Sequence, residues 1–557
     1  MEIEGRRETL EDFLVRLQSE KPRLAHILSL EWSYLDPVNL GEFKIRESKT
    51  SGEKFALVLP DIATCDSCLE ETMDAKDRRY FYPFTNCTHC GPRFSIINKL
   101  PYDRPNTSMK SFRMCPACMK EYKDPKDRRF HAQPTACPSC GPRIQMLSSD
   151  GTPMAWEDEA LLMACAVVRS GKILGLKGIG GFLLLADARN EEALKRLRQR
   201  KMREEKPLAL MYPGLAAIEK DCFVYALESR LLESPEKPIV LLKKRPSISV
   251  SELVAPGNPY LGVMLPYAPI HHLLMMELGF PVVATSGNLT DEQMATETDE
   301  AVGKLGQIAD AFLTHDRPIV RRMDDSIARV IEGREIILRR ARGFAPLPME
   351  VARKLPRILA LGGHLKNSIA MSKRNQIFVS QHIGDLETRE AIEAFRQTVK
   401  DFHKLYEFKP EVVATDLHPA YASTQFGESL GLDVHKVQHH LAHVYSVMAD
   451  NGLEGSPIGI SWDGTGYGED NTVWGGEFII PREGRVEWMA GFEPFPLIGG
   501  EKAIKEPRRT ALGMLYACLG KEAFEMENLP TLKAFTDEEA EWVRAAIEKD
   551  VQCPKCR

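Results

Sequence analysis

Eight cysteines between residues 65 and 140 form four C-x-x-C pairs. Two such pairs supply the four sulfur ligands of a tetrahedral zinc site. The first 20 residues are strongly charged and contain no apolar signal core, so we expect a cytosolic chain. In that compartment paired thiols bind metal more often than they form disulfides. The pairs are Cys65 and Cys68, Cys87 and Cys90, Cys115 and Cys118, and Cys137 and Cys140.

The cysteine pairs belong to a segment that occurs twice with an offset of 50 residues. A D-R-R triplet at 77–79, between the pairs of the first copy, recurs at 127–129 in the second. The duplication favours one zinc ion per copy. Two alternatives stay open, namely a cross-braced arrangement with ligands from both copies on each ion, and a metal-free set of reduced thiols.

The charge of this segment bears on its partners, because zinc ribbons often contact nucleic acid. Residues 65–143 carry 14 Lys and Arg against 9 Asp and Glu, an excess nearly cancelled by eight thiolates and two zinc ions. The whole chain of 557 residues has a net charge of −6. We therefore expect two structural zinc ions and no nucleic-acid partner.

Composition excludes several other classes. Hydrophobic residues make up 43% and charged residues 27% of the chain, which is typical of globular rather than disordered or fibrous proteins. The longest weakly charged stretch, 260–277, is interrupted by prolines and is shorter than the ~20 residues of a membrane span. We expect buried core there and no membrane partner.

A second group of metal-binding type lies at His439, His440 and His443. On a helix, His439 and His443 share one face and could hold one ion, whereas a simple histidine pair is more often a surface or packing feature. Asp463 follows an apolar strand pattern and precedes the turn residues Gly464, Thr465 and Gly466. A carboxylate beside such a turn suits metal–phosphate binding, although an ordinary hairpin is the alternative.

Two clusters in the middle of the chain could bind phosphate. Lys201, Arg203 and Lys206 precede an apolar strand pattern, and three cations facing a pocket would suit a polyphosphate. A loop with Thr285, Ser286 and Asn288 follows the apolar run 281–284. Its hydroxyls and backbone N–H groups can hold phosphate. A solvated helix end and a plain turn are the alternatives.

Periodicity predicts the elements that position these residues. Helical and strand patterns alternate at 160–170, 172–176, 191–201 and 208–212, which indicates an α/β domain. An amphipathic helix is expected near 8–19, with a strand on either side. The predicted segments are 1–50, the cysteine module 51–147, a linker at 148–153, an α/β domain 155–345 and a second α/β domain 355–557.

The K-x-R…KP element, the 285–288 loop and the segment 261–267 resemble YrdC-like domains, which activate a carbamate or carbamoyl group as its adenylate. The histidine cluster, the segment 458–468 and the turn 361–368 resemble TsaD-like domains of the actin/hexokinase type. With the duplicated cysteine module, the chain resembles the HypF family, carbamoyltransferases that mature nickel–iron hydrogenases. The fold class is then multidomain α/β and α+β, with a partial acylphosphatase-like segment at 1–50.

The resemblance implies a role for each candidate residue. Lys201, Arg203, Lys206 and Ser286 would be catalytic, and Thr285, Ser286 and Asn288 would line the ATP site. Asp463, Gly464, Thr465 and Gly466 would contact nucleotide or phosphate. His439, His443 and Asp463 would hold a second metal, iron or zinc.

The same resemblance implies the reaction. Carbamoyl phosphate would supply carbamate, ATP with Mg²⁺ would convert it to carbamoyl adenylate, and the carbamoyl group would pass to the C-terminal cysteine of HypE. The alternatives are tRNA threonylcarbamoylation and O-carbamoyl transfer, families that lack the cysteine repeat, or a zinc-ribbon protein that binds nucleic acid.

The sequence departs from the family pattern at both ends. The acylphosphatase loop V-Q-G-V-G-F-R is absent, as are the late S-S-x-G-R-L-F-D-A and N-D-G-G elements of the TsaD-like domain. We therefore expect a chain truncated at both ends. Cys553 and Cys556 could form a fifth knuckle, but nothing nearby supplies two further ligands.

Overall fold

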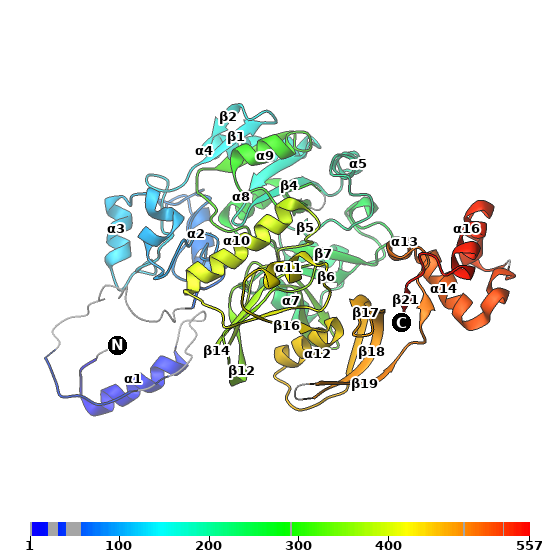
Figure 1. The fold of residues 1–557 in the computed structure, drawn as a ribbon. Helices are drawn as coiled ribbons and strands as arrows, with labels where there is room; N and C mark the ends of the chain where they lie inside the picture. Colours follow the sequence, from blue (N-terminus) through cyan, green and yellow to red (C-terminus); the bar gives the residue numbers. More distant parts are fainter. Residues whose placement is uncertain are drawn as a thin grey trace. The chain divides into compact units, whose positions relative to one another are not determined.

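The computed structural model describes residues 3–20, 30, 32–39, 57–289, 292–482, 485–526 and 528–557. The chain divides into two compact units, Met1–Ala345 with Lys404–Glu407, and Pro346–His403 with Phe408–Arg557 (Figure 1). Across the part of the chain that the structure describes, no helix has both the length and the apolar character needed to cross a bilayer.

The expected N-terminal helix is confirmed as α1, Arg7–Ser19. Its apolar residues Leu10, Phe13, Leu14 and Leu17 are its half-buried side. The strands expected on either side of it within 1–50 fall partly on 1–2, 21–29, 31 and 40–50, outside the described residues, and the described stretches 3–6 and 32–39 contain none.

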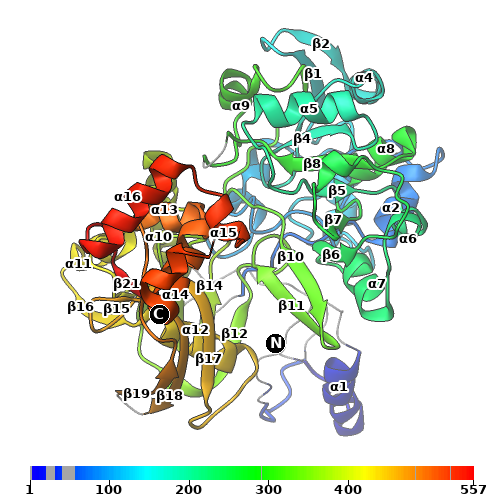
Figure 2. The same cartoon turned by 90° about the vertical axis from the view of Figure 1, so that its right-hand side faces the viewer.

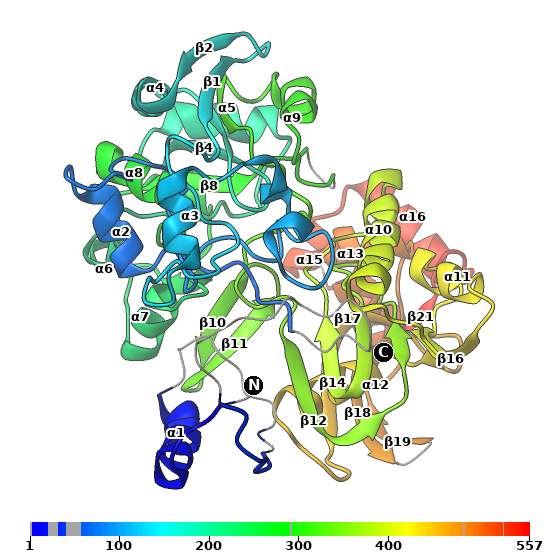
Figure 3. The same ribbon diagram turned by 90° about the vertical axis from the view of Figure 1, so that its left-hand side faces the viewer.

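The cysteine module is built from two equivalent halves. Each half begins with a short helix, α2 at Asp66–Met73 and α3 at Pro116–Lys123, followed by a loop that carries the second cysteine pair (Figure 3). Two 3₁₀ turns, η1 at Arg104–Asn106 and η2 at Ser108–Ser111, connect the halves. Most of the module is irregular, so the packing of its few apolar side chains and the thiol clusters must hold its shape.

The first α/β domain contains a mixed sheet of eleven strands among the described residues, in the order β11-β10-β6-β7-β5-β8-β4-β3-β9-β1-β2. The strands are β1 Ile144–Ser148, β2 Pro153–Trp156, β3 Leu174–Lys177, β4 Phe182–Asp187, β5 Leu210–Met211, β6 Ile239–Lys243, β7 Tyr260–Met264, β8 Val282–Ser286, β9 Ala311–His315, β10 Ile327–Ile331 and β11 Arg334–Arg339. The strands and helices expected at 160–212 are confirmed in type, with shifts of up to three residues at their ends.

Helices cover both faces of this sheet. The helices are α4 Glu157–Arg169, α5 Glu191–Arg200, α6 Leu215–Asp221, α7 Ala226–Glu233, α8 Pro269–Leu278 and α9 Thr298–Leu305, with the 3₁₀ turn η3 Glu252–Val254. α4 and α8 share one core with alternate strand residues such as Leu174 and Leu176. α5 (Figure 2), with α6, α7 and α9, packs on the other core. Burial on both faces explains why the strands read as continuous apolar runs.

The cysteine module shares the first of these two cores. Tyr82, Phe84, Ile96, Met109 and Ala136 belong to the same buried cluster as the apolar side chains of α4 and α8. Module and sheet are therefore one folding unit with a common interior.

The expected linker at 148–153 is instead the turn of a hairpin between β1 and β2. Gly151 has a positive φ of 89°, and the Asp150 carboxylate accepts a hydrogen bond from the Thr152 N–H at 3.1 Å. Glycine and aspartate thus close a tight turn. Because β1 also pairs with β9, the sheet already begins at Ile144.

The second unit contains two five-stranded sheets among the described residues, one ordered β12-β14-β13-β15-β16 and one ordered β17-β18-β21-β20 with β19 paired to β18. The strands are β12 Pro348–Leu355, β13 Ile358–Ala360, β14 Ala370–Val379, β15 Val412–Asp416, β16 Asp433–Val437, β17 Gly459–Tyr467, β18 Val473–Arg482, β19 Arg485–Gly491, β20 Phe495–Pro496 and β21 Lys555–Cys556. The helices are α10 Arg389–Tyr406, α11 Ala422–Glu428, α12 His439–Asp450, α13 Glu501–Lys505, α14 Pro507–Leu519, α15 Pro530–Lys533 and α16 Asp537–Glu548, with the 3₁₀ turn η4 Gly520–Phe524. α12 lies against β17 and β18.

Candidate functional site

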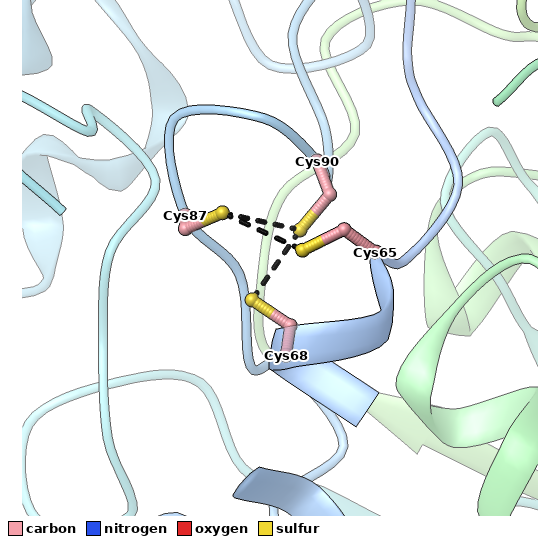
Figure 4. A group of neighbouring side chains, drawn as sticks. All are labelled: Cys65, Cys68, Cys87 and Cys90. Atoms are coloured by element: carbon pink, nitrogen blue, oxygen red, sulfur yellow. Dashed lines mark hydrogen bonds between the residues drawn. The ribbon is translucent and has the colours of Figure 1, made fainter. Parts of the chain in front are cut away.

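The first thiol cluster is formed by Cys65, Cys68, Cys87 and Cys90, whose sulfurs point toward one another (Figure 4). Cys65 is the residue before α2 and Cys68 lies in its first turn, so the helix start fixes one pair. The S···S distances are 3.7 Å for Cys65–Cys87, 3.9 Å for Cys87–Cys90 and 3.5 Å for Cys68–Cys90. Zinc–sulfur bonds of ~2.3 Å require tetrahedron edges of ~3.8 Å. The cluster therefore fits a zinc ion.

The second cluster repeats this geometry with Cys115, Cys118, Cys137 and Cys140. Its S···S distances are 3.8 Å for Cys115–Cys137 and 3.7 Å for both Cys137–Cys140 and Cys118–Cys140. Each cluster takes its four sulfurs from one copy of the repeat, so the ligand sets are not cross-braced. The arrangement is that of two separate structural zinc sites.

Cys553 and Cys556 do not form a fifth knuckle. The Cys553 side chain packs in the core with α14 and α16, whereas Cys556 packs beside Phe495 and Leu497. Among the described residues, neither belongs to a group of three or more metal-binding side chains. Their thiols act as small apolar core groups.

A third group with metal-binding geometry lies in the second unit. His439 and His443, one turn apart on α12, both face Asp463 of β17. Asp463 Oδ2 is 3.1 Å from His439 Nε2 and 3.4 Å from His443 Nε2. Although burial raises it, the two adjacent imidazoles lower the pKa of the Asp463 carboxyl. Two imidazole nitrogens and one carboxylate oxygen so placed can bind a divalent transition metal.

Asp416, at the carboxyl end of β15, was not predicted from the sequence. Its Oδ2 lies 2.7 Å from His439 Nδ1, on the side of the ring away from Asp463. This hydrogen bond, together with the adjacent Asp463 carboxylate, raises the pKa of His439 to about 9. A carboxylate behind a ligating imidazole is the usual outer support of a metal-binding histidine. An acid directly after the strand-type segment V-V-A-T at 412–415 was the available sequence signal.

Two glycines near this group leave room for the histidine rings. A Cβ on Gly466 would lie 2.3 Å from His440 Cε1, and one on Gly363 would lie 3.6 Å from His439 Cε1. Gly464, Thr465 and Gly466 lie within an irregular part of β17, where its register with β18 shifts. The structure thus places them in a strand beside the histidines, not in a free hairpin turn.

His439→Ala and His443→Ala should each abolish metal binding at this group, because each removes one of three converging ligands. His440→Ala should leave metal affinity nearly unchanged, since His440 is fully buried and its Nδ1 contacts Gln438 Nε2 at 3.0 Å. Titration with Co²⁺, followed by visible absorption, measures all three. Equal losses in the three variants would contradict the assignment.

The Thr285–Asn288 loop brings together most of the remaining candidates. Lys201 Nζ donates to the Ser286 carbonyl at 2.5 Å and to the Asn288 carbonyl and Oδ1 at 2.8 Å each. Arg203 Nη1 donates to Thr285 Oγ1 at 3.2 Å. An ammonium has three N–H donors, and these three contacts can occupy all of them. Lys201 therefore fixes the conformation of the loop and places a positive charge beside it.

Lys206 does not join this cluster through its side chain, which is exposed, while its carbonyl accepts a hydrogen bond from Arg203 Nε at 3.2 Å.

Burial lowers the pKa of Lys201 to about 7 and that of Arg203 to about 10. The loop end of β8 thus holds two desolvated cations beside a hydroxyl-rich turn, an arrangement that suits an anionic ligand.

Comparison with known proteins covers nearly the whole chain. The family model described as HypF finger matches 64–97 and 114–147, and that described as Telomere recombination, of the Sua5/YciO/YrdC family, matches 166–341. HypF Kae1-like domain matches 353–450, and Carbamoyltransferase, Kae1-like Domain, second subdomain matches 459–557. Carbamoyltransferase HypF of Synechocystis is 47% identical over 542 residues, covering 97% of this chain and 70% of that protein. The chain belongs to the HypF carbamoyltransferase family.

Solved structures of HypF agree with this assignment. A crystal structure of full-length HypF in its phosphate- and nucleotide-bound form has a TM-score of 0.94 and 42% identity, over 99% of this chain and 72% of that one. The structure of HypF from T. kodakarensis has a TM-score of 0.91 and 37% identity, over 100% of this chain and 73% of that one. The two HypF finger matches contain the two thiol clusters.

Proposed function

We propose that this chain joins carbamate to ATP and passes the carbamoyl group to the C-terminal cysteine of HypE during hydrogenase maturation. Hydrolysis of carbamoyl phosphate by water supplies the carbamate and releases inorganic phosphate. A carbamate oxygen attacks the α-phosphorus of ATP, and pyrophosphate leaves. The HypE thiolate then attacks the carbamoyl carbon of the adenylate, the C–O bond breaks, and AMP leaves.

The observation that carries this proposal is the cluster at the loop end of β8. Lys201 fixes the Ser286 and Asn288 backbone, and Arg203 contacts the Thr285 hydroxyl. In the proposed reaction the loop N–H groups and hydroxyls bind the ATP phosphates. The two cations stabilise the negative charge that develops at the transferred phosphorus. A full-length HypF has been crystallised in a phosphate- and nucleotide-bound form, which supports nucleotide binding by this chain. Mg²⁺ would accompany ATP as the substrate complex.

The transfer step is assigned to the second unit. His439, His443 and Asp463 would hold the metal, with Asp416 orienting His439. Bound there, a divalent metal would supply a Lewis acid and a template for phosphate oxygens. We assign adenylate formation to the domain at 155–345 and carbamoyl transfer to the domain at 355–557.

Carbamate-dependent exchange of labelled pyrophosphate into ATP tests the first step. The exchange should require bicarbonate with ammonia, or carbamoyl phosphate, and mass spectrometry should detect carbamoyl adenylate. Dependence on L-threonine instead would favour the tRNA threonylcarbamoylation alternative. Incubation with HypE should then give a thiocarbamate on its C-terminal cysteine, and HypE without that cysteine is the control.

The affinity for ATP should fall as the pH rises through 7. Lys201, whose pKa is lowered to about 7 by burial, is an ammonium below that pH and loses its charge and one donor above it. If the nucleotide binds only the ammonium form, affinity at pH 8 should be about tenfold weaker than at pH 6. Calorimetry at both values measures this. Lys201→Arg, charged throughout, should give a flatter profile, and a flat wild-type profile would contradict the assignment.

A further inference from the structure

The two zinc repeats exchange arginines. Arg128 of the second repeat donates from Nη1 to Cys68 Sγ of the first at 3.1 Å. Arg78 of the first repeat donates from Nη2 to Cys118 Sγ of the second at 3.4 Å. Cys68 and Cys118 are equivalent positions in the first turns of α2 and α3, and both are fully buried. Each thiol cluster therefore receives a guanidinium from the opposite repeat.

Carboxylates hold the exchanged arginines in place. Glu71 of α2 lies 2.5 Å from Arg128, and Glu121 of α3 lies 2.6 Å from Arg78. Each glutamate also pairs with the next arginine, Arg129 or Arg79. Each contact made by one repeat has its counterpart 50 residues away in the other repeat.

The second arginine of each triplet anchors its loop to the opposite repeat. Arg79 and Arg129 are only 1% and 3% exposed. Their Nε atoms donate to backbone carbonyls of the other repeat, to Ala136 at 2.9 Å and to Asn86 at 3.1 Å. Because both loops are fixed in this way, the first arginine of each triplet is held beside the thiol cluster of the opposite repeat.

We propose that Arg78 and Arg128 are outer-shell hydrogen-bond donors exchanged between the zinc sites, and that they couple zinc occupancy of one site to that of the other. Four thiolates around Zn²⁺ leave a net charge of −2, which a permanently charged guanidinium offsets through a charge-assisted N–H···S bond. Each arginine lies on a loop of its own repeat, whose fold depends on its own zinc, and it is paired with a glutamate of the other repeat. The coupling is therefore reciprocal.

Site-resolved metal release tests the exchange. With Cd²⁺ in place of zinc, ¹¹³Cd NMR should give one resonance per cluster, assigned with Cys87→Ser and Cys137→Ser. Arg128→Gln should speed metal release from the Cys65 cluster by about 10–100-fold, the usual effect of losing an outer-shell partner. In this variant the Cys115 cluster should release its metal more slowly than the Cys65 cluster. Arg78→Gln should show the reverse pattern. Lys126→Gln and Lys76→Gln, exposed residues of the same loops, are the matched controls and should leave both rates unchanged.

The pattern of release decides between a donor role and a merely structural one. Faster release from the variant's own repeat, equal release from both clusters, or no change would each overturn the proposal. If Arg128→Gln fails to fold, Arg128→Lys, which keeps a charged donor, should fold and release metal from the Cys65 cluster at an intermediate rate. In an otherwise wild-type chain, Cys137→Ser should speed metal release from the Cys65 cluster. The same substitution should have no such effect when it is added to Arg128→Gln.

Discussion

Replacing Lys201 with methionine is expected to reduce carbamate-dependent ATP–pyrophosphate exchange by about 10²–10³-fold, the cost of removing a preorganised donor. The ammonium binds three acceptors on Ser286 and Asn288, so its loss frees the loop and leaves those oxygens without their buried partner. Methionine has a similar length and no charge, so the variant removes the interactions with little change in volume.

Lys206→Met is the matched control for this variant. Lys206 lies five residues away in the same segment, and its side chain is exposed. Its exchange rate should stay close to that of the wild type, and Lys201→Arg should recover part of the lost activity. Full activity of Lys201→Met in a folded, zinc-loaded sample, or a larger loss in Lys206→Met, would contradict the loop assignment.

Cys87→Ser should remove one of the two zinc ions and sharply lower the thermal stability of the first unit. A structural zinc contributes ~10–16 kcal/mol to the folding of a small finger, far more than an ordinary core contact. The loss should extend to the sheet, because Tyr82 and Phe84 of the module share a core with α4 and α8. Metal analysis and calorimetric unfolding measure the two effects.

Cys518→Ser is the control for the thiol substitution, since Cys518 is exposed and belongs to neither thiol cluster. It should keep two zinc ions per chain and an unchanged unfolding temperature. Two tightly bound zinc ions in Cys87→Ser would contradict the ligand set, and an unchanged unfolding temperature would show that the cluster does not support the shared core.

Local features of the sequence predicted the zinc module well. A C-x-x-C pair fixes its own geometry at a helix start, and the second copy of the repeat identifies which pairs belong together, as the clusters at Cys65 and Cys115 show. Positions i and i+4 on a helix likewise placed His439 and His443 on one face, and the structure places Asp463 against them. The assignment of the chain to its family rested on the same short motifs.

Features that depend on distant pairing were not predicted. Asp416 supports His439 only because β15 pairs in parallel with β16, which leads directly into α12. We predicted a linker at the polar segment 148–153, because its turn residues do not reveal that β1 joins the sheet beside β9. The three acceptors of Lys201 also lie 85 to 87 residues away and are mostly backbone atoms, which leave no side-chain signal.

The exchanged arginines give the zinc module an internal two-fold symmetry. Arg78 contacts Glu121 as Arg128 contacts Glu71, and Arg79 reaches Ala136 as Arg129 reaches the equivalent Asn86. When residue i of one copy contacts residue j of the other and the reverse also holds, the interface is isologous, as in a symmetric homodimer. A single copy of the repeat therefore carries both halves of a self-complementary surface. The fused pair has the geometry of a dimer whose subunits have become consecutive segments of one chain.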